Sequence, residues 1–129
     1  MQGVPAQAKE LNTMFLGKAT LTNSACAQYL QAGLEALEQR IYFRAVAQLS
    51  KAVAEFRKRN VLDATSLMAK VSLGQALLGN GQNDTAEKIF LDCAGRARDL
   101  GDTRQHAKAL TSLATISAER ADFKRAQTY

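Results

Sequence analysis

The chain has 129 residues, which is enough for one domain and leaves no room for a separate catalytic domain. Alanine and leucine together fill 39 of these positions, whereas there is one proline, no tryptophan and only 6% aromatic residues. Because Ala and Leu are among the strongest helix formers, this composition predicts an all-α protein.

The net charge of +5 comes from one part of the chain, residues 40–59, which contains six basic side chains and one acid. Arg44, Lys51 and Lys58 recur every seven positions, opposite a stripe of apolar side chains, so we expect them on a solvated outer face. Aromatic side chains that could stack on bases are absent from this face, and we expect no nucleic-acid partner. An electrostatic contact of this face with RNA, an acidic protein or a membrane surface is the alternative.

The sequence contains no window of about 18 apolar residues, so it predicts no membrane span. Residues 1–10 lack the basic flank and the apolar run of a signal peptide, and we therefore expect a cytoplasmic location. Cys26 and Cys93 are too few for a disulfide scaffold and are expected to be small buried residues.

Apolar side chains at helical spacing predict helices along the whole chain. Gly81 and Gly101 indicate helix ends, and Asp84 and Asp102 each carry Glu or Gln three residues later, which is typical of a capped helix start. The predicted helices are 24–39, 42–58, 62–79, 84–99 and 103–119, with another one beginning near Asp122.

The pattern repeats with a period of about 40 residues, which is typical of stacked helix pairs. Small residues 12 positions apart mark each unit: Gly33 with Ala45, Gly74 with Ala86, and Ala114 with Ala126.

These residues resemble the signature of the tetratricopeptide repeat family. The longer period is similar to that of Leu-Gly-Asn repeat adaptors and kinesin light chains. The sequence departs from the signature at Asn83, where an aromatic residue is usual, and no proline closes a unit. The matching positions are Gly33, Tyr42, Ala45, Leu49 and Ala52 in the first unit, Gly74, Gly81, Ala86, Phe90 and Cys93 in the second, and Leu113, Ala114, Phe123 and Ala126 in the third.

The resemblance implies a right-handed solenoid of helical hairpins with about six to seven helices. The predicted single domain, 1–129, divides into an N-terminal helix or partial preceding repeat (1–22), repeat 1 (24–59), repeat 2 (62–100) and an incomplete repeat 3 (103–129).

The resemblance also implies a non-catalytic adaptor that binds a peptide or amphipathic helix of a partner protein on its concave inner face. Chaperone-binding members clamp a carboxylate there, and only Lys108 matches their basic residues. The expected partner-binding residues are Leu30, Leu34, Leu37, Met68, Val71, Gln75, Leu78, Lys108, Thr111 and Thr115.

The alternative hypothesis is a self-associating segment, a homodimer or part of a longer solenoid, whose inner face is covered by its own chain. Leu11, Met14 and Phe15 could supply that cover.

We expect neither catalysis nor a metal or other cofactor. His106 is the only histidine, and the candidate Cys and His ligands lie more than ten residues apart.

Overall fold

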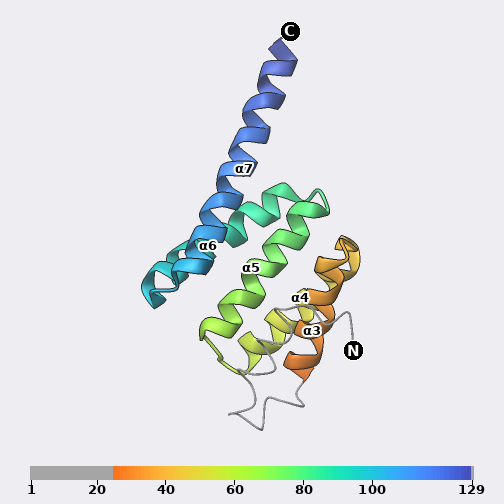
Figure 1. The fold of residues 1–129 in the computed structure, drawn as a ribbon, viewed down its shortest axis with the longest axis vertical. Helices are drawn as coiled ribbons and strands as arrows, with labels where there is room; N and C mark the ends of the chain where they lie inside the picture. The colour runs from red at the N-terminus through yellow and green to blue at the C-terminus, as the bar shows by residue number, and fades with distance from the viewer. Residues whose placement is uncertain (1–24, 129) are drawn as a thin grey trace.

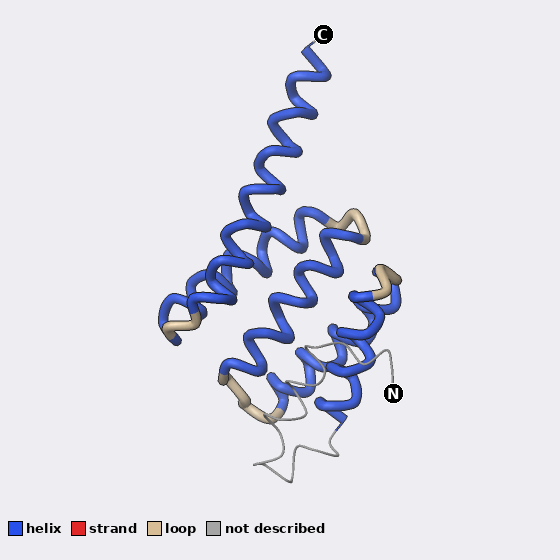
Figure 2. The backbone as a smooth tube through the Cα atoms, in the orientation of Figure 1, coloured by secondary structure: helices blue, strands red, loops and turns tan. Residues whose placement is uncertain are grey.

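The computed structural model describes residues 25–128, which form five α-helices joined by short connections (Figures 1 and 2). The helices are α3 (Ala25–Glu38), α4 (Tyr42–Lys58), α5 (Ala64–Gly79), α6 (Asn83–Leu100) and α7 (Thr103–Thr128). No strand occurs within this range, and the prediction of an all-α protein is confirmed there. The N-terminal helix or partial repeat expected over 1–22 lies outside the described residues.

Helix α5 is the centre of the arrangement. Each helix packs against the next one in the chain, and α5 also contacts α3 and α7. With neighbours on so many sides, α5 buries 11 of its 16 residues. This explains why its sequence is apolar all round rather than along a single stripe.

All four connections begin with the same hydrogen-bonded turn. Within two positions of the end of each helix, a single residue has a positive φ: Arg40 (61°), Asn60 (56°), Gly81 (82°) and Gly101 (73°). The amide of the residue that follows donates to a carbonyl five positions earlier, at 2.9 Å in each case. This is the Schellman motif, which satisfies carbonyls that a helix end leaves free. The two glycines indicated this turn in the sequence, whereas Arg40 and Asn60 gave no such signal.

The helix starts confirm one predicted cap and correct another. Asp102 caps α7, because its Oδ1 accepts a hydrogen bond from the amide of Gln105 at 3.1 Å. Asp84 was expected to cap α6, but α6 begins at Asn83 and Asp84 lies within its first turn. The Asp84 carboxylate instead pairs with Arg120 of α7, at 2.8 Å.

Helix α7 is continuous, and the predicted break before Asp122 is wrong. No glycine or proline lies between residues 119 and 128 to end a helix. Figure 1 shows the C-terminal part of α7 projecting beyond the other helices. Residues 25–128 therefore contain five helices, not the six to seven expected for the chain, because the helix predicted near Asp122 is part of α7.

The two hairpins make the same close contact at positions 41 residues apart. A Cβ atom added to Gly33 of α3 would lie 2.5 Å from Cγ of Leu49 in α4. A Cβ added to Gly74 of α5 would lie 2.8 Å from the ring of Phe90 in α6. In both hairpins a large side chain of the second helix therefore rests directly on the backbone of the first, where only glycine leaves enough room.

Contacts between successive hairpins are also equivalent, with one change of chemistry. The Tyr42 ring at the start of α4 lies against Gly79 at the end of α5. At the corresponding place between α6 and α7, Asn83 Nδ2 donates a hydrogen bond to Glu119 Oε2 at 3.1 Å. The departure from the family signature at Asn83 thus replaces a ring contact with a hydrogen bond.

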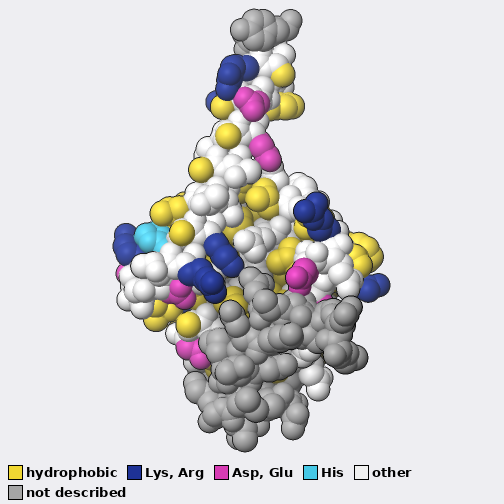
Figure 3. Space-filling model, viewed as in Figure 1, with side chains coloured by type: hydrophobic (Ala, Val, Ile, Leu, Met, Phe, Trp, Pro, Cys, Tyr) yellow, Lys and Arg dark blue, Asp and Glu magenta, His cyan; other side chains and the backbone are white. Residues whose placement is uncertain are grey.

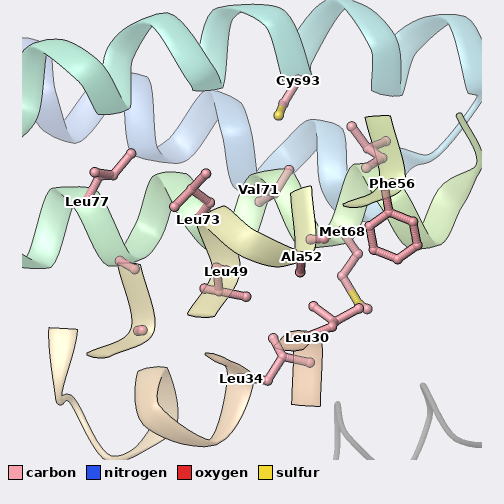
Figure 4. Close-up of a cluster of buried hydrophobic side chains, with 14 of the residues drawn as sticks. Leu30, Leu34, Leu49, Ala52, Phe56, Met68, Val71, Leu73, Leu77 and Cys93 are labelled. Atoms are coloured by element: carbon pink, nitrogen blue, oxygen red, sulfur yellow. The ribbon is translucent and has the colours of Figure 1, made fainter. Parts of the chain in front are cut away.

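The hydrophobic core runs continuously from α3 to α7. Figure 4 shows Met68 extending from α5 toward Leu30 of α3, with Phe56 of α4 beside it. These three side chains are at most 9% exposed. Side chains of three helices therefore close this part of the core together.

Gly33→Ala should destabilise the protein by about 1–3 kcal/mol, because the new methyl group collides with a packed leucine and its backbone. Gly95→Ala is the matched control, since a Cβ there meets nothing within 4 Å, and it should stabilise α6 by about 0.5–1 kcal/mol. Urea denaturation measures both effects. Equal effects of the two substitutions would contradict the close approach of α3 and α4.

Candidate functional site

The candidate functional site is the inner face, formed by the exposed sides of α3, α5 and α7. Contacts of α5 with both α3 and α7 place the three helices next to one another. Figure 3 shows hydrophobic side chains gathered in the middle of one face of the molecule, with Lys and Arg side chains near them.

Four of the predicted partner-binding residues belong to the core rather than to this surface. Leu30, Leu34 and Val71 are at most 2% exposed, and Met68 is 9% exposed. They are needed between α3, α4 and α5, as Figure 4 shows for Met68 and Leu30. The structure therefore leaves little of these four side chains accessible to a partner.

The other six predicted residues reach the surface. Leu37, Gln75, Leu78 and Lys108 are half-buried, and Thr111 and Thr115 are exposed. Leu37 and Leu78 pack with their inner sides on the core and leave their outer sides accessible.

The site changes character from α3 to α7. Leu34, Gln75 and Thr115 occupy equivalent positions in the three helices, and their exposure increases in that order. Thr115 Oγ1 donates a hydrogen bond to the carbonyl of Thr111 at 3.1 Å, so this hydroxyl donor is already used within the helix. Most of the accessible part of the inner face is therefore the half-polar strip on α5 and α7, to which Leu37 adds an apolar contact on α3.

A group of charged side chains that sequence reasoning missed links α7 to α6. Arg120 donates to Glu87 at 2.7 Å and to Asp84 at 2.8 Å, and these hydrogen bonds raise the pKa of its guanidinium. Exposed ion pairs of this kind contribute little individually, so they add to the packing of α7 on α6 and do not determine it. In the sequence, Asp84 and Glu87 indicated only a capped helix start. Their partner Arg120 could not be recognised, because it lies 33 to 36 residues further along the chain.

The basic side chains that recur every seven positions on α4 lie at the surface, as predicted. Arg44, Lys51 and Lys58 are all exposed on α4. Lys51 Nζ lies 5.6 Å from the centre of the Tyr29 ring, within the distance of a cation–π contact. These charges are therefore solvated.

Both cysteines are buried, as predicted. Desolvation by burial raises the pKa of the Cys93 thiol from 9.0 to about 11, so the thiolate that a nucleophile requires is disfavoured at neutral pH. His106 is half-buried in the first turn of α7. Among residues 25–128, no group of three or more His, Cys, Asp or Glu side chains could hold a metal ion.

Across the same residues, no helix combines the length and the hydrophobicity that crossing a bilayer requires. Comparisons with protein-family models, with curated proteins and with solved structures each gave no match for the chain.

The raised pKa of Cys93 has a consequence for stability at high pH. Well below pH 9 the thiol is neutral in both the folded and the unfolded chain, so the contribution to stability is fully present. It should be lost as the pH rises from 9 toward 11, where the unfolded chain ionises first. Denaturation of wild type and Cys93→Ala across this range should show a larger loss in the wild type. Parallel curves would contradict the buried neutral thiol.

Proposed function

We propose that the protein is a non-catalytic cytoplasmic adaptor with a tetratricopeptide-like arrangement of helical hairpins. Its inner face binds a peptide or an amphipathic helix of a partner protein. The observation that supports this most directly is the repeated contact at Gly33 and Gly74, which stacks equivalent hairpins and leaves α3, α5 and α7 adjacent. In such stacks one side of successive helices forms an extended binding surface.

The chemistry of the accessible strip favours a partner with one apolar and one polar side. Leu78 offers a half-exposed apolar contact, and Gln75 beside it can both donate and accept hydrogen bonds. Lys108 adds a positive charge on α7. A carboxylate clamp needs further basic residues, and only Lys108 matches them. We therefore expect recognition of an amphipathic helix rather than of a free C-terminal carboxylate.

Self-association is the second candidate, and it is favoured by the exposed apolar side chains of α7. Leu110 is 50% exposed and Phe123 is 64% exposed. Ala114 follows Gly74 by 40 residues and is exposed, whereas Gly33 and Gly74 are each covered by a following helix. A helix of a second copy that covers this position would complete the third hairpin.

Leu78→Asp should weaken peptide binding by roughly tenfold or more, because one apolar side chain covered by a partner contributes about 1.5–3 kcal/mol. Leu91→Asp on α6 is the matched control, since Leu91 is 59% exposed and lies on a helix outside the inner face. Helical peptides selected from a displayed library against the full chain provide the ligands, and fluorescence anisotropy measures their affinity.

Equal affinity of the selected peptides for both variants would contradict binding at the inner face. Sedimentation of the wild type over a concentration series distinguishes self-association from peptide binding. Self-association requires a dimer in the wild type, and Ala114→Arg should disrupt it.

A further inference from the structure

A concave surface lies between α4 and α6, away from the inner face. We call it the α4–α6 groove, and its volume is about 430 Å³. This is within the range of roughly 300–1,000 Å³ that ligand pockets usually have. The apolar part of its wall consists of Val53, Phe56, Val61 and Leu62. Leu62 is 69% exposed, although it stands beside a buried core.

The charged part of the groove has an excess of positive charge. Arg57, Lys70 and Arg96 line it together with a single acid, Asp92. Asp92 is already paired, because Lys70 Nζ lies 2.6 Å from its Oδ2. Because Asp92 neutralises Lys70, the positive charges of Arg57 and Arg96 have no acidic partner in the lining of the groove.

Arg96 is the important member of this group. Arg96 is half-buried as a residue, and its Nη2 donates to Ser66 Oγ at 3.4 Å, a long hydrogen bond to a neutral group. Among residues 25–128, no carboxylate lies within ion-pair distance of Arg96 or Arg57. A guanidinium near apolar walls interacts more strongly with an incoming carboxylate than one in open water.

We propose that the α4–α6 groove binds an acidic peptide segment of a partner protein, in which a leucine or an aromatic residue stands beside Asp or Glu. The apolar side chain would lie against Val53, Val61 and Leu62, and the carboxylate would pair with Arg57 and Arg96. Charge complementarity supports this occupant, because the groove offers two unpaired cations next to an apolar wall.

This site is separate from the proposed inner-face function. Its residues belong to α4, the α4–α5 connection, the N-terminal half of α5 and the C-terminal half of α6. None of them is among the partner-binding residues predicted from the sequence. Arg57 is the member of the basic region 40–59 that takes part, which gives that region a specific role beyond its solvated stripe.

Two displayed heptapeptide libraries test the proposal on the full chain. One library has a central Leu or Phe flanked by Asp and Glu, and the other has Asn and Gln in place of the acids. We expect enrichment of the acidic library only. Affinities of selected peptides are then measured by anisotropy at about 0.15 M salt, where distant exposed charges are largely screened.

Binding of the selected peptides should fall roughly tenfold or more in Arg57→Gln, in Arg96→Gln and in Leu62→Asn. Arg57 and Leu62 are exposed, so substituting them should leave the fold intact. These two variants therefore still test the groove if Arg96→Gln fails to fold. Arg98→Gln is the control, because it removes the same charge from an exposed position of α6 that does not line the groove.

Three results would overturn the proposal: no enrichment of the acidic library over the neutral one, an equal loss in Arg98→Gln, or no loss in the groove variants. If Leu78→Asp weakens the acidic peptides while the groove variants do not, they bind the inner face. That outcome overturns the groove and leaves the adaptor function standing.

Discussion

The structure depends on how closely the two helices of each hairpin approach. Leu49 rests on the backbone of Gly33, and Phe90 rests on that of Gly74. Interiors pack as densely as crystals, so a contact at this distance fixes both the separation of the two helices and their register. Because the same contact occurs twice, 41 residues apart, both hairpins acquire similar geometry, and α5, the first helix of the second hairpin, packs against α3 and α4 of the first.

The central position of α5 decides which side chains remain for function. A helix with neighbours on several sides has little free surface, and most of α5 is buried. The apolar residues of α3 and α5 that could have formed a binding groove are used to hold the hairpins together. What remains accessible is the strip around Gln75 and Leu78, continued by α7, and the α4–α6 groove with its unpaired arginines.

The helices could be predicted from the sequence because their periodicity is strong. The predicted limits of 42–58 agree with α4, and the others differ by one or two residues for α3, α5 and α6. The end of α7 could not be predicted in this way. A repeat pattern suggested a turn before Asp122, but the residues there are all compatible with a helix, and Arg120 pairs with acids that are distant in the sequence.

The site was harder to predict than the fold. An apolar residue at helical spacing fits a groove and a core equally well, and only the number of neighbouring helices distinguishes them. Leu30 and Val71 are therefore core residues, although the family register placed them on the surface. The α4–α6 groove gave no signal at all, because its walls come from four segments that meet only in the folded chain.

Native-state hydrogen exchange tests most directly whether the contacts of α5 with α3 and α4 couple the two hairpins into one cooperative unit. We expect amides of residues 67–77 to exchange only through global unfolding, with the free energy that urea denaturation gives. Amides of residues 121–127, which are all exposed and lie beyond the contacts of α7 with α6, should exchange through much smaller openings. Exchange from α5 through a lower free energy than from α3 or α6 would contradict the account.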